Sequence, residues 1–300
     1  MKCGGVDNLP TQSTCHRARE NDMGLLDGQV ALVTGGARGM GRSHAVAFAR
    51  EGADVVLFDA CANEPWAVYP GASKADLEAT RGLIEGQGRR CLARQGDVRN
   101  SDDLAGLVKE VVADFGRIDI LVANAGMAGA ESIQVASRET WDGIIGTNLT
   151  GVFNSIRAVA PQMIEQNYGR IVAISSLMGR MAGPAVGAYA ASKWGVIGLV
   201  KSAAQDLAAF GVTVNAVAPG NVDTPMINND GFLKPLLPHL ENPTLADAAP
   251  FLGLLHVQPT AILAPEEITA AVLFLVSASG THITGSVIDV NAGASARITA

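Results

Sequence analysis

Apolar and polar positions along the chain follow two patterns, one typical of buried strands and one typical of helices. Short apolar runs rich in β-branched residues occupy 30–35, 53–59, 91–98, 118–126, 169–176, 211–220 and 286–293. Segments between them show apolar residues at helical spacing, at 41–51, 73–87, 101–115, 138–166, 187–210 and 265–278. Strands that alternate with helices form right-handed crossovers and a sheet covered on both faces. The pattern predicts a doubly wound, Rossmann-type α/β domain with a seven-stranded, mostly parallel sheet.

The first 23 residues differ from the rest of the chain. They are polar and contain no apolar run typical of a signal peptide, so we expect a disordered tail at 1–23. Residues 24–300 contain no internal repeat or linker, which predicts one domain. Two connections within it are longer than a turn requires: an insertion at about 60–73 and a segment at about 225–263.

Charge and cysteine usage narrow the classes of function. The net charge of −7 disfavours a nucleic-acid surface, because no basic stripe offsets the repulsion. The apolar runs are short and interrupted, so no membrane span is expected. The four cysteines, Cys3, Cys15, Cys61 and Cys91, form no CxxC motif and lie at no metal-ligand spacing with histidine. They indicate reduced thiols in a cytoplasmic protein, with no metal site expected.

A glycine-rich turn, TGGARGMG at 34–41, joins the first strand to the first helix. Its pattern is G-x-x-x-G-x-G, at Gly35, Gly39 and Gly41. Glycines in this place let the backbone approach a diphosphate, which then meets free N–H groups at the helix N-terminus. The turn therefore predicts a dinucleotide site.

Acidic residues at the next strand ends indicate which dinucleotide binds. Asp59 ends the second predicted strand, where a carboxylate accepts the ribose hydroxyls of adenosine and repels a 2′-phosphate. This predicts NAD rather than NADP, although Arg38 in the glycine turn favours NADP weakly. Asp97 follows the third strand, where it either contacts the adenine or caps a helix.

The stretch AYAASKWG, at 188–195, places a phenol and an ammonium group one helical turn apart. Taken alone, Tyr189 and Lys193 fit an ordinary amphipathic helix equally well. Four further motifs stand with this pair in a fixed order along the chain: TGGARGMG at 34–41, NAG at 124–126, SS at 175–176 and PG at 219–220. Together the motifs resemble the short-chain dehydrogenase/reductase family, over residues 25–295. Ala123 departs from the asparagine that often precedes NAG.

The resemblance implies a catalytic set. Tyr189 is the implied acid/base, and Lys193, beside an oxidised nicotinamide, is expected to lower the pKa of the phenol and to bind the nicotinamide ribose. Ser176 is expected to hydrogen-bond the reacting oxygen, with Ser175 as the alternative. Asn148 is expected to hold a water in a proton relay to the lysine. Further implied cofactor contacts are Gly35, Gly39, Met40, Asp97, Val98, Asn124, Ala125, Gly126, Pro219, Gly220, Val222 and Thr224.

The sequence of the insertion indicates which branch of the family the chain resembles. ACANEPWAVYPGA follows Asp59, and with GRRCLARQGDVRN it is similar to the branch that contains carveol dehydrogenases and mycofactocin-coupled oxidoreductases of actinobacteria. That resemblance implies a tightly held NAD whose electrons pass to the peptide-derived carrier mycofactocin. Trp66, Tyr69 and Pro70 are expected to cover the adenosine side of the cofactor; the alternative is a plain surface loop.

The segment 225–263 is rich in Leu, Phe and Pro, and we expect it to be an irregular lid over an apolar substrate such as a cyclic terpenoid alcohol. The alternative is a contact between subunits, and the family resemblance implies a homotetramer. The predicted function is an NAD-dependent oxidoreductase that interconverts a secondary alcohol and its ketone. Alternatives are a freely exchanging 3-oxoacyl or other ketone reductase and a non-catalytic nucleotide sensor.

Overall fold

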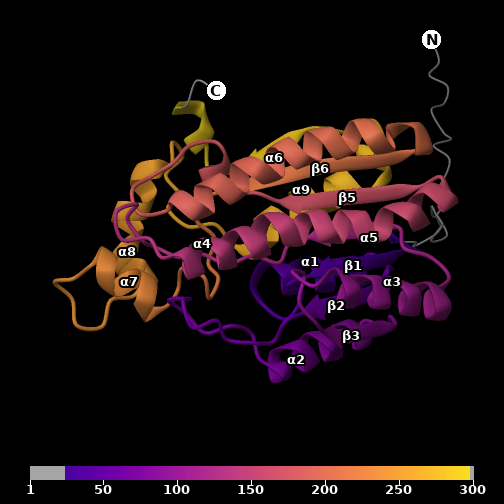
Figure 1. The fold of residues 1–300 in the computed structure, drawn as a ribbon, viewed down its shortest axis with the longest axis horizontal. Coiled ribbons are helices and arrows are strands. Elements are labelled where there is room, and N and C mark those ends of the chain that lie inside the picture. Colours follow the sequence, from indigo (N-terminus) through magenta and orange to yellow (C-terminus); the bar gives the residue numbers. More distant parts are fainter. Residues whose placement is uncertain (1–23, 298–300) are drawn as a thin grey trace, which may run out of the picture.

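Seven parallel strands form one sheet. The computed structural model describes residues 24–297, so the predicted tail at 1–23 lies outside the described residues. The strands are β1 (Val30–Thr34), β2 (Asp54–Asp59), β3 (Cys91–Gln95), β4 (Ile120–Ala123), β5 (Gly169–Ile174), β6 (Val212–Pro219) and β7 (Val287–Val290). They pair in the order β3-β2-β1-β4-β5-β6-β7, and every pairing is parallel (Figure 1). The predicted doubly wound α/β fold is confirmed.

Helices cover both faces of this sheet. One core joins it to α3 (Ser101–Phe115), α5 (Gly151–Gln166) and α6 (Gly187–Leu207), and the other joins it to α1 (Gly39–Arg50), α2 (Lys74–Glu85) and α9 (Pro265–Val276). Alternate residues of β1 enter different cores: Val30 and Leu32 face the first, Ala31 and Val33 the second. Because both faces are buried, the strands are apolar throughout, which is the pattern seen in the sequence.

The segment 225–263 is not irregular, so that expectation was wrong. It contains α7 (Asp230–Leu236) and α8 (Leu245–Leu252), which lie together at one end of the molecule (Figure 1). Asn229 and Thr244 cap the two helices, with Oδ1 and Oγ1 accepting the N–H groups of Phe232 and Asp247. A proline inside each helix hides it in the sequence pattern. Their buried apolar side chains pack on one another: Leu233, Leu237, Leu245, Ala248 and Leu252.

The predicted helical segment 138–166 is interrupted by a π-helical turn. α4 (Arg138–Ile145) ends where the turn Gly146–Thr150 begins, and α5 follows directly. Such turns contain one residue more than an α-helical turn and occur mostly at functional sites. Asn148 lies in the middle of this turn and is fully buried.

The topological switch point lies between β1 and β4. Their neighbours β2 and β5 continue the sheet in opposite directions, so the connections that leave β1 and β4 diverge at their carboxyl ends. Thr34 joins the two connections, because its Oγ1 accepts the N–H groups of Asn124 (3.0 Å) and Ala125 (3.1 Å). A ligand cleft is expected at this edge of the sheet.

A buried carboxylate fixes the opposite ends of β1 and β4. Asp119 is fully buried, and its Oδ2 accepts the N–H of Val30 at 2.9 Å and Nε of Arg117 at 2.7 Å. Asp119→Ala leaves both donors without this acceptor, and we expect the free energy of unfolding to fall by about 3 kcal/mol in urea titrations. Asp142→Ala, which breaks an exposed ion pair with Arg138, should change it little. Equal losses in the two variants would contradict the role given to Asp119.

Candidate active site

An open cleft of about 1000 Å³ lies at the carboxyl ends of β1, β2, β3 and β4. Predicted cofactor residues that line it are Gly35, Arg38, Gly39, Met40, Asp59, Asp97, Val98, Asn124, Ala125, Gly126 and Thr224. The sheet therefore brings segments far apart in the sequence to one site. The other predicted cofactor residues are not among the lining residues, and their contacts with a cofactor stay predictions: Tyr189, Lys193, Pro219, Gly220 and Val222.

The glycine turn leaves backbone N–H groups open to an anion. Gly35 has a φ of +65°, and a methyl group added there would lie 2.8 Å from Cα of Ala125. The first turn of α1 has no side-chain cap, whereas Ser73 and Asn100 cap α2 and α3. The uncapped N–H groups and the close approach of two backbones fit a bound diphosphate.

Asp59 is held rigidly at the end of β2. Its Oδ2 accepts the N–H of Ala37 at 3.1 Å, and its Oδ1 accepts the N–H of Cys61 at 3.0 Å. Arg38, the residue that favoured NADP, donates instead to the carbonyl oxygen of Pro70 in the insertion. Asp59 thus keeps a fixed place in the cleft, and Arg38, which also lines it, has one guanidinium N–H bonded to the insertion.

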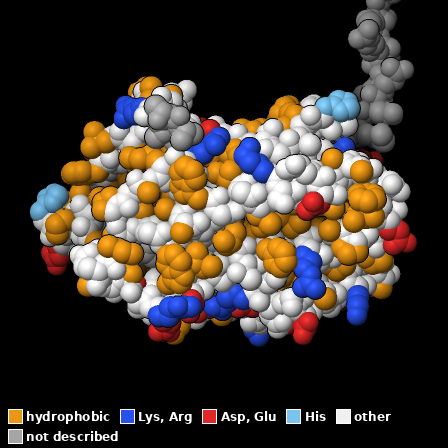
Figure 2. Space-filling model, turned by 45° about the horizontal axis from the view of Figure 1, so that its top comes forward, with side chains coloured by type: hydrophobic (Ala, Val, Ile, Leu, Met, Phe, Trp, Pro, Cys, Tyr) orange, Lys and Arg blue, Asp and Glu red, His pale blue; other side chains and the backbone are white. Residues whose placement is uncertain are grey.

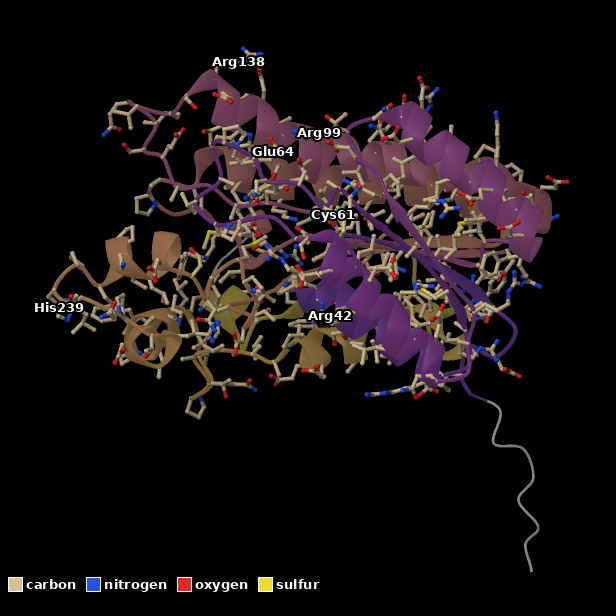
Figure 3. All side chains as sticks on the ribbon, turned by 90° about the horizontal axis from the view of Figure 1, so that it is seen from below. Arg42, Cys61, Glu64, Arg99, Arg138 and His239 are labelled. Atoms are coloured by element: carbon tan, nitrogen blue, oxygen red, sulfur yellow. The ribbon has the colours of Figure 1, made fainter. Side chains whose placement is uncertain are left out.

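An ion-pair network that sequence reasoning missed lies at the end of β3. Arg99 donates to the carboxylates of Asp97 (2.6 Å) and of Glu64 in the insertion (Figure 3). Burial acts to raise the pKa of Asp97, but the hydrogen bonds from Arg99 outweigh it and hold that pKa below its ordinary value. Glu64 and Arg99 are 35 residues apart, and no local spacing indicates that they meet.

The α6 helix places Tyr189 and Lys193 one turn apart, beside the end of β5. Nζ of Lys193 is 5.6 Å from the centre of the Tyr189 ring and donates to the carbonyl oxygen of Ile174 at 2.8 Å. Oγ of Ser176 accepts the N–H of Met178 at 3.1 Å, and the Ser176 hydroxyl acts to lower the pKa of Tyr189. Oγ of Ser175 instead donates to the carbonyl oxygen of Lys193 at 2.9 Å, which attaches β5 to α6. Of the two serines, only Ser176 faces the phenol.

Asn148 links this cluster to the loop after β4. Its Oδ1 accepts the N–H of Met127 at 2.8 Å, and its Nδ2 donates to the carbonyl oxygen of Met127 at 2.8 Å and to Oγ of Ser192 at 3.2 Å. A methyl group added to Gly126 would lie 3.4 Å from Oδ1 of Asn148 and 3.5 Å from Nζ of Lys193. Because Gly126 lines the cleft, the cluster stands at one end of it. The water contact of Asn148 stays a prediction.

Burial dominates the acid–base properties of the cluster. It raises the pKa of Tyr189, and the hydrogen bond with Ser176 opposes this rise. It lowers the pKa of Lys193 to about 8. The expected lowering of the phenol pKa by Lys193 is therefore not produced by the protein's own groups, because burial raises this pKa and the opposing contribution comes from Ser176. A lowered pKa of Tyr189 would therefore require the positive charge of an oxidised nicotinamide.

The insertion reaches the loop after β4. The Tyr69 hydroxyl accepts the N–H of Ala128 at 3.3 Å, close to the catalytic cluster. A methyl group added to Gly143 would lie 2.4 Å from the Trp66 indole, so that ring packs on α4. These contacts do not show where an adenosine would lie, so the covering role of Trp66 and Tyr69 stays a prediction.

A glycine turn, an acidic strand end and a Ser–Tyr–Lys cluster at the switch point of a parallel sheet define a dinucleotide-dependent oxidoreductase site. The sequence model of the family described as short chain dehydrogenase matches residues 29–231, and the chain belongs to this family.

Relatives of this chain include several named dehydrogenases. An uncharacterized NAD-dependent oxidoreductase of Mycobacterium tuberculosis is 42% identical over 273 residues, 90% of this chain and 97% of the relative. The (-)-trans-carveol dehydrogenase of Rhodococcus erythropolis is 38% identical over 276 residues, 90% of this chain and 99% of the relative. A 3-oxoacyl-[acyl-carrier-protein] reductase of Staphylococcus epidermidis is also 38% identical, over 88% of this chain and 97% of the relative. Identity alone therefore does not separate the two substrate classes.

One solved structure is similar to this protein in both sequence and fold. Carveol dehydrogenase from Mycobacterium avium, in complex with NAD, is 39% identical with a TM-score of 0.88, over 90% of this chain and 99% of that chain. Within residues 24–297, no helix combines the length and apolarity that a membrane crossing needs. The same residues contain no group of three or more His, Cys, Asp or Glu side chains suited to a metal ion.

Lys193 should make stability depend on pH. Its folded pKa of about 8 lies below the ordinary 10.5, so the folded state resists protonation and the buried charge is destabilising below pH 8. This cost disappears as the pH rises from about 8 to 10.5, and stability should rise over that window. The free energy of unfolding of Lys193→Met relative to wild type should thus fall by roughly 3 kcal/mol between these pH values.

Urea titrations across this pH range test the effect, with Lys201→Met as the control. Lys201 is an exposed lysine on the same helix, and its removal should produce no comparable change. A difference between Lys193→Met and wild type that stays constant with pH would contradict the burial of a titrating ammonium group.

Proposed function

We propose that this protein is an NAD-dependent oxidoreductase that interconverts an apolar secondary alcohol and its ketone. The observation that supports this most strongly is the position of Tyr189, Lys193 and Ser176 at one end of the cleft that the glycine turn and Asp59 line. A nucleotide sensor has no need for a buried phenol and ammonium group at this place, since both cost free energy. The residues therefore favour an enzyme over the sensor.

The cleft fits NAD in three respects. The uncapped N-terminus of α1 suits the diphosphate, the rigid carboxylate of Asp59 suits the adenosine ribose hydroxyls, and the bond from Arg38 to Pro70 occupies one donor that a 2′-phosphate would otherwise use. The relative from M. avium, which is bound to NAD, agrees with this choice. When bound, the nicotinamide supplies the ring carbon that exchanges a hydride with substrate.

The chain's own residues handle the proton. Tyr189 accepts the proton of the substrate alcohol during oxidation and returns it during reduction. Ser176, whose hydroxyl acts to lower the pKa of the phenol, holds the substrate oxygen beside Tyr189. Lys193 has one donor hydrogen fixed on Ile174, and its remaining N–H groups are available to the nicotinamide ribose. Asn148 orders the loop from Gly126 to Met127 and the proton path to the lysine.

The insertion at 60–73 lines one side of the cleft. It is attached by Glu64 to Arg99, by Trp66 to α4, by Tyr69 to Ala128 and by Pro70 to Arg38. Four attachments along the length of the cleft suit a cofactor that stays bound between turnovers. We therefore include tightly held NAD in the proposal, with mycofactocin as the electron acceptor.

The substrate is apolar in this proposal, and a cyclic terpenoid alcohol such as carveol is the representative case. The segment 225–263 serves as the substrate lid, since it follows Thr224 in the cleft. Many of its apolar side chains, including Leu233 and Leu245, are buried among themselves, so fewer remain for the substrate than the sequence suggested. The runner-up is a freely exchanging 3-oxoacyl reductase, supported by the relative from S. epidermidis.

The proposal includes a homotetramer. Phe153 on α5 and Trp194 on α6 are each 46% exposed, and Figure 2 shows apolar side chains spread over the face that carries these helices. Exposed aromatic groups of this kind suit a contact between subunits. The cytoplasmic location stays a prediction.

Tyr189→Phe should strongly slow turnover and leave NAD binding intact. Loss of the hydroxyl removes the proton acceptor, so we expect the rate of alcohol oxidation to fall by about 10²–10⁴-fold. NAD binding should persist, because the ring and the cleft remain. Rapid-mixing measurements of nicotinamide absorbance with a panel of secondary alcohols, together with the nucleotide content of the variant, provide the test. A Tyr189→Phe enzyme with wild-type rates would overturn the acid–base assignment.

The retention of cofactor should separate the two enzyme hypotheses. Denaturing the purified protein should release a stoichiometric amount of NAD(H), because the attached insertion blocks its exit. Multiple turnovers should then require an added artificial acceptor, whereas free NAD should not sustain them. Release of no nucleotide, with steady turnover on free NAD, would favour the freely exchanging ketone reductase.

A further inference from the structure

Several residues of the insertion line the cleft, and Tyr69 is the aromatic one among them. Its side chain is only 7% exposed, and it lines the same cavity as Gly35, Gly39 and Gly126. Its neighbours Val68 and Pro70 are both exposed. The insertion therefore places one phenol inside the proposed cofactor site, between the glycine turn and the end of β4.

Contacts on several sides fix the position of this phenol. The hydroxyl oxygen accepts the N–H of Ala128, and the carbonyl oxygen of Pro70 accepts a hydrogen bond from Arg38. Before Tyr69, the Trp66 ring packs on Gly143 in α4. A side chain held in this way loses little further entropy when it binds a ligand.

The hydroxyl retains a hydrogen that it can donate. Burial raises the pKa of Tyr69 to about 12, so the phenol is neutral at physiological pH. Within residues 24–297 the hydroxyl accepts one hydrogen bond, from Ala128, and donates none. A buried hydroxyl usually satisfies its donor, so a ligand oxygen is the expected acceptor. Because Tyr69 keeps its proton, its role differs from the acid–base role proposed for Tyr189.

We propose that Tyr69 is a cofactor-positioning residue whose O–H donates to an oxygen of the dinucleotide, between its diphosphate and its nicotinamide ribose. The cofactor is a better acceptor than the substrate, because Tyr69 shares the cleft with the glycine turn and an apolar alcohol offers few oxygens. This inference rests on the proposed NAD site. The insertion then binds the cofactor directly, in addition to covering it.

Tyr69→Phe tests the hydroxyl alone, because the variant keeps the aromatic ring and the insertion that carries it. We expect NADH to dissociate about 10- to 100-fold faster than from wild type, as for loss of one hydrogen bond to a charged or strongly polar group. Dissociation is followed by the fluorescence of bound NADH after dilution into excess NAD. The melting temperature of the nucleotide-free protein should not change, which excludes a purely structural effect.

Two further variants complete the test. Tyr168→Phe removes a phenol hydroxyl that accepts Nε2 of Gln29 at 3.3 Å and lies outside the cleft, so NADH release should match wild type. Tyr69→Ala removes ring and hydroxyl together. If only Tyr69→Ala accelerates release and Tyr69→Phe does not, the ring covers the cleft and the hydrogen-bond proposal is wrong. These measurements use binding alone, so an enzyme that binds NADH but oxidises no alcohol would refute the proposed function without affecting this test.

Discussion

The parallel pairing of β1 with β4 is the constraint on which the whole site depends. It places the glycine turn after β1 beside the NAG loop after β4, and Thr34 joins the two through hydrogen bonds to Asn124 and Ala125. Parallel strands end at the same edge, so Asp59 and Asp97 arrive there as well. Without this register, the cofactor groups and the catalytic cluster would lie at different places on the molecule.

Burial then sets the chemistry of the cluster. A lysine enclosed beside β5 loses solvation, and one hydrogen bond to Ile174 compensates only part of that loss, as the lowered pKa shows. The phenol of Tyr189 experiences the opposite shift from the same cause. Both groups are therefore moved toward neutrality, and a positive charge brought in by an oxidised cofactor would stabilise the phenolate. Binding of an oxidised cofactor and ionisation of the Tyr189 phenol would therefore be coupled electrostatically.

The sequence predicted the features that depend on local pattern. Strands buried on both faces are apolar throughout, and the ordered motifs locate Gly35, Asp59, Ser176, Tyr189 and Lys193 without any long-range information. Features created by long-range contacts could not be predicted. The π-helical turn at Asn148 has no residue signature of its own, and prolines concealed α7 and α8. The final position of Trp66 and Tyr69 depends on α4 and on the loop after β4, which no spacing within the insertion indicates.

The insertion also contacts the segment 225–263. A methyl group added to Gly231, in the first turn of α7, would lie 2.0 Å from the carbonyl oxygen of Val68. Val68 directly precedes Tyr69, so the residue that borders the lid adjoins the one that enters the cleft. A dinucleotide leaving the cleft under the insertion would have to displace Tyr69 from Ala128 and Pro70 from Arg38. These two contacts of the insertion thus add to the free energy that opening this part of the cleft would cost.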